Sequence, residues 1–364
     1  MKLLNKLFPL KTIKKFASLA ACSAMICASL SSCNSGPLFD FEGDCDPHYY
    51  LQFVFDRNMH YNDYHGIGAD AFAAQVGSVE VYVFNPSTGE FVASYKDSGN
   101  HLRDYGYRLE LDNLTPGDYD IIAWCGLENN EDHFTLQKNV SRPEHLTCTM
   151  TRSVDAEDNT VYCDKNLKPL FHGRLSHKFP DKQGDHYATV YLTKNTNYIQ
   201  LALHHNAGEL ESDRFSVTME DTNGYLAHDN SLLSDDLIQY RPWSQRGGVV
   251  DMDMLNYSTK AAEDGTGFLV AELATSRLMA DNDPRLTVTD KQTGQAVFSL
   301  PLVKYLLMMK SDRYAAMDGQ EYLDREDEYS VIVFLENSKN NEGWLAAQIV
   351  INGWHIVNNG NVGL

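Results

Sequence analysis

The stretch Leu51–Gly66, LQFVFDRNMHYNDYHG, joins two patterns that point to different structures. Its first half places apolar residues at alternating positions, and a period of two predicts a strand with one buried face. Its second half packs several potential ligands into ten positions, namely Asp56, Asn58, His60, Asn62, Asp63 and His65. The first half therefore predicts a fold, and the second half raises the question of a metal or catalytic site.

Runs with the same alternation recur along the chain at short intervals. Turn-forming segments such as NPSTGE, NLTPGDY and DTNGY separate them. Helical pattern is confined to GADAFAAQVGS, with Ala71, Phe72 and Val76 facing inward, and to LPLVKYLLMM. The sequence predicts an all-β fold of two β-sandwich domains in tandem with one or two short helices. The expected strands are YLQFVF, SVEVYVFN, EFVASY, YGYRLEL, YDIIAW, LFHGRLSHKF, ATVYLT, NYIQLALHH, RFSVTME, GFLVAELA, RLTVTD, AVFSL, YSVIVFLE and AAQIVIN.

The length of 364 residues allows one large domain or two of ordinary size. The polar segments TRSVDAEDNTVYCDKN and SHKFPDKQGDHY mark a change of character between the two halves. We therefore expect a boundary near residue 180, with an N-terminal sandwich at 47–180 and a C-terminal sandwich at 181–364. The run TVYLTKNTNYIQLALHH is expected to form the opening hairpin of the second domain.

The first residues resemble a bacterial lipoprotein signal peptide. Five lysines precede the apolar run FASLAACSAMICASL, which is shorter than the roughly 20 residues of a spanning helix. The run ends in Leu30-Ser31-Ser32-Cys33, which matches a lipobox. We expect residues 1–32 to be removed and Cys33 to be acylated, with palmitate among the acyl groups. More than one acyl chain on Cys33 gives stable anchoring, and residues 33–46 would form the tether.

Composition excludes one class of partner. The formal net charge is −20, and nucleic-acid binding needs basic stripes that the sequence does not show. We expect no nucleic-acid partner.

Four of the seven cysteines remain after Cys33 and the two in the signal segment are set aside. Outside the cytosol, four cysteines permit two disulfides in three connectivities. We favour Cys148 with Cys163, which are close in sequence, and Cys45 with Cys125.

The polar half of the opening stretch does not fit a known metal site. Asp56, Asn58, His60 and Asn62 share a strand face, but Asn is a weak ligand for transition metals. The Asp-x-Asn spacing lacks the Gly and Glu that complete a calcium loop. We interpret this half as a loop in which Asp56 and Asn58 bond to backbone amides. We expect no metal, no cofactor and no enzymatic activity, since no GxSxG, HExxH or phosphate-binding loop occurs either.

Four segments carry a family resemblance. FVFDRNM is similar to a signature of the fimbrial anchor lipoproteins of Bacteroidota, and VYVFNPSTGEFV, LTPGDYDIIAWCGL and QEYLDREDEYSVIVFLE with IVINGW follow in the family's order. The resemblance covers nearly the whole mature chain. It departs from the family at Arg57, which stands where Tyr is usual. A cut at Arg57 would separate Cys33 from the body, so we expect this residue to be protected.

The resemblance implies two transthyretin-like domains and a non-catalytic role at the base of a pilus. The anchor would be monomeric before assembly, held in the outer membrane by its lipid and exposed at the cell surface. Its partner would be a fimbrillin-like stalk subunit, and it would limit the length of the fibre.

The last strand is a candidate for contact with that partner. Ile349 and Ile351 alternate on one phase, whereas Trp354 and Ile356, next to Val357, alternate on the other. The phase changes at Gly353, where a bulge or a crossing between partners would fit. The strand either completes a neighbour's sheet or stays in its own domain.

A second function remains open, namely a surface lipoprotein that binds glycan or another host ligand. Such a platform would expose several aromatic side chains on one sheet face. The four tryptophans are scattered in the sequence, which weakens this alternative.

Overall fold

Every alternating run identified above forms a strand, and the prediction of an all-β fold with short helices is confirmed. The computed structural model describes residues 46–128, 132–137, 139–206, 209–250, 266–310, 314–337, 344–352 and 354–357. The signal segment, Cys33 and nearly all of the tether lie outside these ranges. Residues Pro47–Leu364 form one unit by their internal contacts.

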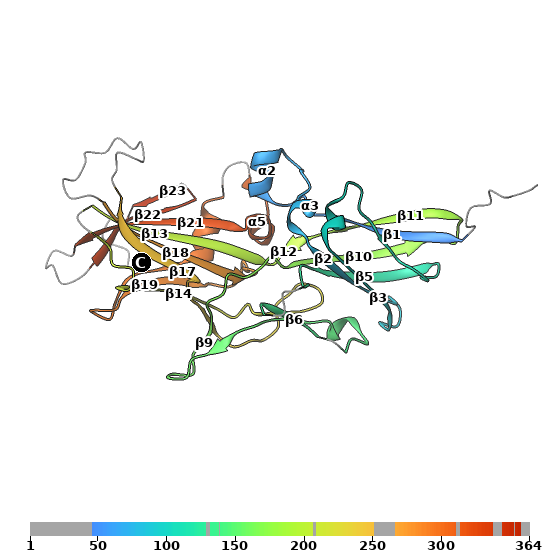
Figure 1. Cartoon of the computed structure of the whole chain (residues 1–364), viewed down its shortest axis with the longest axis horizontal. Helices are drawn as coiled ribbons and strands as arrows, with labels where there is room; N and C mark the ends of the chain where they lie inside the picture. The colour runs from blue at the N-terminus through green and yellow to red at the C-terminus, as the bar shows by residue number, and fades with distance from the viewer. Residues whose placement is uncertain are drawn as a thin grey trace, which may run out of the picture. The chain divides into compact units, whose positions relative to one another are not determined.

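Two sheets enclose the first core (Figure 1). Sheet A has the order β11 (Gly184–Tyr191), β1 (Pro47–Val54), β4 (Leu109–Glu110). Sheet B has the order β12 (Thr193–Lys194), β10 (Phe171–Phe179), β5 (Gly117–Cys125), β2 (Ser78–Phe84), β3 (Phe91–Ser98). Tyr49, Leu51 and Phe53 of β1 are buried against apolar side chains of β2 and β5. The alternation that predicted β1 therefore reflects one face in this core.

The remaining strands form three sheets. Sheet C is β15 (Tyr225–Leu226), β7 (Cys148–Met150), β6 (Phe134–Leu136). Sheet D is β20 (Gln295–Pro301), β19 (Arg285–Asp290), β14 (Phe215–Asp221), β16 (Ile238–Tyr240), β9 (Val161–Cys163), β8 (Ser153–Val154). Sheet E is β17 (Ser244–Val250), β18 (Thr266–Ser276), β13 (Thr196–His205), β21 (Glu328–Asn337), β22 (Trp344–Ile351), β23 (Trp354–Val357).

Sheets D and E contribute most of the second core, which is larger than the first. Leu201 and Val331 from sheet E lie in one cluster with Val217 and Leu286 from sheet D. Trp124 of sheet B belongs to the same cluster and is fully buried. Sheet B therefore contributes side chains to both cores.

Strand pairing differs from the expected division at residue 180. β11 pairs in parallel with β1, and β12 pairs with β10, so residues as far as Lys194 belong to sheets A and B. The predicted hairpin within TVYLTKNTNYIQLALHH is wrong, because β11 joins sheet A and β13 joins sheet E. β8 and β9, which precede residue 180, belong to sheet D. The two-domain boundary itself stays a prediction.

The helices are short. α3 (Phe72–Gln75) and α4 (Leu302–Met308) lie in the two predicted helical segments, and Ala71, Phe72 and Val76 are buried as expected. The structure adds α2 (Met59–His65), α5 (Gly319–Arg325) and the 3-10 turns η1 (Asn100–Arg103) and η2 (Pro143–His145). Among the described residues, no helix is long and apolar enough to cross a membrane.

α2 replaces the loop that was predicted for the polar half of the opening stretch. Asn58 caps the helix, because its Oδ1 accepts from the backbone N–H of Tyr61 at 2.7 Å. Gly66, with a φ of 101°, ends it and donates to the carbonyl of Asn62. The expected backbone bond of Asn58 is confirmed. Asp56 Oδ1 is buried without a hydrogen-bond partner.

The close packing of sheet A on sheet B gives a test at Gly173 in β10. A Cβ at this position would lie 2.5 Å from Val190 Cγ1 and 2.8 Å from the carbonyl oxygen of Tyr191. We expect Gly173→Ala to lower the free energy of unfolding by about 1–3 kcal/mol, because the strands must move apart. Urea denaturation measures the change. Gly77→Ala is the matched control, because nothing lies within 4 Å of its added Cβ. An equal effect of both substitutions would contradict the packing argument.

Candidate functional site

β1, the first strand of the described chain, is paired with a neighbouring strand on each side. β1 pairs with β11 through eight registered residues, from Pro47 opposite Gly184 to Val54 opposite Tyr191. Tyr50 and Leu51 pair with β4 on the other side. The side chains of β1 that face inward are nearly inaccessible to solvent. The strand nearest to the tether is therefore the middle strand of sheet A, with one face buried; Figure 1 shows it beside β11.

The link after β1 contains Arg57. Its side chain is exposed, and its guanidinium carbon lies 6.0 Å from the ring centre of Tyr191. The neighbouring backbone is fixed, because Phe55 N–H donates to Asp70 Oδ1 at 2.8 Å and Asn58 caps α2. Fixed flanking backbone favours the expected protection of Arg57 from cleavage, which stays a prediction.

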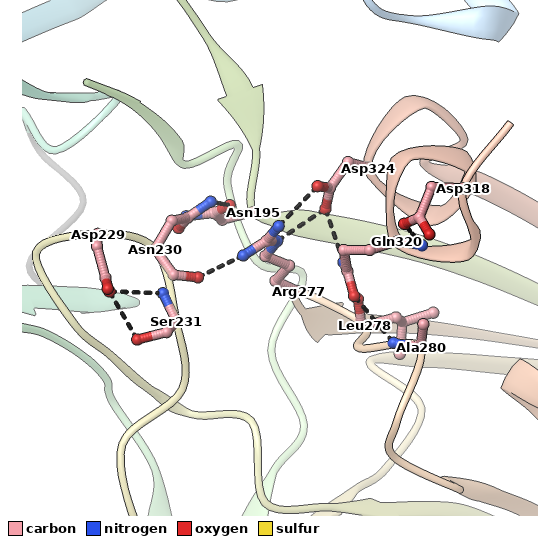
Figure 2. A network of polar contacts seen from close by, with 10 residues as sticks. All are labelled: Asn195, Asp229, Asn230, Ser231, Arg277, Leu278, Ala280, Asp318, Gln320 and Asp324. Carbon is pink, nitrogen blue, oxygen red and sulfur yellow. Dashed lines mark hydrogen bonds and ion pairs between the residues drawn. The ribbon is translucent and has the colours of Figure 1, made fainter. Parts of the chain in front are cut away.

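A second feature, which sequence reasoning missed, lies where the chain passes from sheet B to sheet E. Arg277, just after β18, makes two bonds to the carboxylate of Asp324 on α5, with Nε–Oδ1 at 2.7 Å and Nη2–Oδ2 at 2.6 Å (Figure 2). Arg277 also donates to the carbonyl of Asn230. The side chains of Arg277 and Asp324 are only 11% and 19% exposed. Such a two-bond pair fixes orientation as well as distance.

The crossing segment itself is part of this network. Asn195 is fully buried, and it exchanges amide hydrogen bonds with Asn230 at 2.6 and 3.1 Å. The preceding Lys194 pairs with Asp327, the residue directly before β21. We call this set the polar junction; its members are Lys194, Asn195, Asn230, Arg277, Asp324 and Asp327.

α5 supports the polar junction through its own cap. Asp318 accepts from the backbone N–H of Gln320 and begins the helix. The Gln320 side chain then donates to Asp324 Oδ1 at 2.9 Å and accepts from Ala280 N–H at 2.9 Å (Figure 2). The Asp324 carboxylate is thus held by Gln320, one turn earlier on α5, as well as by Arg277. The sequence signal was the D-x-x-E capping pattern from Asp318 to Glu321.

A carboxyl group beside the polar junction has an unusual pKa. Burial, followed by the charges of Asp327, Asp63 and Glu328, raises the pKa of Glu326 to about 8. The folded protein therefore binds this proton more tightly than the unfolded chain does. The stabilisation is complete below the ordinary glutamate pKa and is lost as the pH rises towards 8.

The C-terminal segment pairs within its own sheet. Ile349 and Ile351 of β22 are buried, and β23 pairs antiparallel with β22, with Trp354 opposite Ile351 and Ile356 opposite Ile349. Val357 pairs with Gln348. The side chains of β23 and residue Gly353 lie outside the described residues.

The expected bulge or crossing falls on Gly353, which lies outside the described residues, and it stays a prediction. The described residue just before it, Asn352, has a φ of 44°. Asn352 also exchanges two hydrogen bonds with the backbone of Ser330 in β21. The C-terminal end of β22 is therefore attached to β21 through Asn352.

The favoured disulfide between Cys148 and Cys163 is not formed. Both are free, buried thiols, and they lie in different sheets, C and D. Cys125 is also a free, buried thiol, and Cys45 lies outside the described residues. Burial raises the pKa of all three thiols, which keeps them protonated.

Within the described ranges, no three His, Cys, Asp or Glu side chains lie close enough to hold a metal ion. His60 lies 3.4 Å from Glu328 Oε2, and the ring of His65 stacks on Tyr61. Among the polar residues of the opening stretch, Asn58 thus caps α2 and His60 contacts Glu328 at the start of β21.

Residues 41–360 match the family model of the fimbrillin-A associated anchor proteins Mfa1 and Mfa2. No match was found among curated proteins.

Several solved structures are similar. A candidate adhesin of Bacteroides thetaiotaomicron is 33% identical with a TM-score of 0.70, and the match covers 86% of this chain and 99% of that one. A second protein of the same organism, described as a candidate polysaccharide-binding protein, is 28% identical with a TM-score of 0.68 over 86% and 99%. The fimbrial anchor protein Mfa2 of Porphyromonas gingivalis shares the fold, with 16% identity and a TM-score of 0.62 over 86% and 100%.

The family match supports a fimbrial anchor role at the cell surface. The family consists of structural anchors, which is consistent with a non-catalytic protein. The chain belongs to the family of fimbrillin-A associated anchor proteins.

Proposed function

We propose that this protein is the lipid-anchored base subunit of a pilus. Cys33 carries the acyl chains that hold it in the outer membrane, and residues 33–46 form the tether. The body binds the first fimbrillin-like stalk subunit and thereby limits the length of the fibre. The protein is a monomer before assembly and catalyses no reaction.

The observation that carries this proposal is the way β1 is built into sheet A. A base subunit must transmit tension from its membrane tether to the stalk. The tether joins the body at Pro47, the first residue of β1, and β1 pairs with β11 over its whole length. Family membership and this placement together support the anchor role.

Because β1 and β11 run parallel, tension loads the hydrogen bonds between them in a particular direction. Tension enters β1 at Pro47 and leaves β11 at Tyr191, towards β12 and β13. These points lie at opposite ends of the ladder, so the load shears it. In shear, all the hydrogen bonds must stretch together, whereas in peeling they break one after another. The topology of sheet A therefore suits a strand under load.

The polar junction continues this path into sheet E. Lys194 and Asn195, which follow β11, are bound to Asp327 and Asn230. Asp327 directly precedes β21, which pairs with β13 on one side and β22 on the other. Tension leaving sheet A is therefore shared between the covalent chain and these side-chain contacts.

Single-molecule pulling tests the shear argument. With one handle before Pro47 and the other at Tyr191, we expect a several-fold higher rupture force than with the second handle at Asp185. The first geometry shears the β1–β11 ladder, and the second peels it from one end. Both experiments use the full chain and differ only in the second attachment point. Equal rupture forces would contradict the mechanical role of β1.

A substitution in the polar junction tests its contribution. Asp324→Asn leaves the buried Arg277 guanidinium without its counter-charge, and we expect a loss of about 3 kcal/mol in the free energy of unfolding. Asp118→Asn is the matched control. It removes an exposed pair with Lys178 at 3.8 Å and should cost no more than about 0.5 kcal/mol. Denaturant midpoints of the two variants would be compared, and similar values would show that the junction contributes little.

Deletion of residues 354–364 tests the proposed stalk contact. If the C-terminal strand binds the stalk, either by donation to a neighbour's sheet or as the edge of sheet E, the deletion should abolish co-purification of fimbrillin from native membranes. Cys33→Ala is the control for the other end: it should release the protein from the membrane fraction but leave the stalk bound. Unchanged co-purification after the deletion would rule out a contact through this strand.

A further inference from the structure

The outer face of sheet A carries a row of aromatic side chains. β1 and β11 are in parallel register, with His48 opposite Asp185, Tyr50 opposite Tyr187 and Val54 opposite Tyr191. Because strand side chains alternate, these residues point away from the core that Tyr49, Leu51 and Phe53 fill. We call His48, Tyr50, Tyr187 and Tyr191 the aromatic strip.

The rings of the aromatic strip are aligned and accessible. Tyr50 and Tyr187 have ring centres 5.5 Å apart with 22° between their planes, and His48 continues from Tyr50 at 6.5 Å and 22°. Tyr187 and Tyr191 remain 42% and 53% exposed. Tyr191 lies four residues beyond Tyr187 on the same face, which is about 13 Å along the strand. The strip is thus longer than a single small ring.

Polar contacts hold these rings in place. The Arg108 guanidinium carbon lies 4.6 Å from the ring centre of Tyr50 and 5.4 Å from that of Tyr187. Arg108 Nη1 donates to Tyr187 Oη at 3.0 Å, and Tyr187 Oη donates to Asp185 Oδ2 at 3.0 Å. Tyr50 Oη is 3.4 Å from Glu110 Oε1. Rings that are already fixed lose little side-chain entropy when a ligand binds.

The chemistry of the strip selects among ligands. Asp185 and Glu110 beside Arg108 leave no excess of positive charge, which disfavours nucleic acids and anionic lipid head groups. The acidic groups Asp185 and Glu110 among the rings also differ from the centre of a protein interface, where Asp and Glu are depleted. A sugar ring offers an apolar C–H face and hydroxyl groups that both donate and accept. Aromatic faces with Arg, Asp, Glu, Gln52 and Thr189 alongside match both features.

We propose that the aromatic strip binds a neutral polysaccharide chain, with Tyr50, Tyr187 and Tyr191 contacting successive sugar rings. This activity is separate from attachment of the stalk, because the strip lies on sheet A and the proposed stalk contact lies at the edge of sheet E. The polysaccharide comes either from the surface of the producing cell or from outside it. The chemistry of the strip is the same for both sources.

Affinity electrophoresis of the full chain in detergent tests the proposal. The native gels contain one probe each: neutral surface polysaccharide extracted from the producing cells, β-glucan, xylan or mannan. We expect at least one probe to retard the wild-type protein. Retardation by the cell's own polysaccharide or by the foreign ones identifies the source. No retardation by any probe would overturn the proposal.

Substitutions test whether the polysaccharide binds at the aromatic strip. Tyr50→Ala, Tyr187→Ala and Tyr191→Ala should each weaken binding of the retarding probe about tenfold, which corresponds to about 1.4 kcal/mol. Tyr105→Ala is the matched control, because this tyrosine is fully exposed in a turn and is not part of the strip. It should change binding less than twofold. Thermal unfolding of each variant confirms that the fold is retained. Equal binding by all variants would overturn the assignment of the strip, whatever the outcome of the stalk co-purification.

Discussion

The first core depends on one pairing, that of β1 with β11, whose partners stand 137 positions apart in the register from Pro47 to Gly184. β1 is the middle strand of sheet A, and β4 and β11 both pair with it there. Without β1, sheet A has no remaining ladder, and the aromatic and aliphatic side chains of the first core lose their cover. Such a distant pairing carries a high cost in loop-closure entropy, which only the completed core offsets. The strand that the tether joins is therefore one that the fold cannot release without opening this core.

Alternating apolar residues predicted the strands correctly, because the alternation arises from the side chains that enter a core. Leu51 and Phe53 are buried and Gln52 is exposed, as a period of two requires. One further local signal lies in the sequence: Asn58 and Gly66 bracket α2 as its caps. Hydrophobic periodicity does not register this capping chemistry.

Other features have no local signal. Cys148 and Cys163 are close in sequence, but sheet membership separates them, and nothing in the spacing reveals which sheet each strand joins. Arg277 and Asp324 look like ordinary surface charges in the sequence, because their burial arises only when α5 packs beside the end of β18. The aromatic strip is equally hidden, since Tyr50 and Tyr187 meet only through the register of β1 and β11. The tryptophans give no sign of it, because Trp124 lies in the core and the exposed rings of the strip are tyrosines.

The two faces of β1 connect the proposed roles. Its inner face joins the core, and its outer face carries Tyr50 beside Tyr187 of β11. A polysaccharide that lies across these two rings contacts both strands of the ladder that tension would shear. Because it binds only when the strands are paired, it stabilises the pairing by mass action. The same ladder would thus resist separation more strongly when the strip is occupied, so sugar binding and resistance to load are linked through the register of two strands.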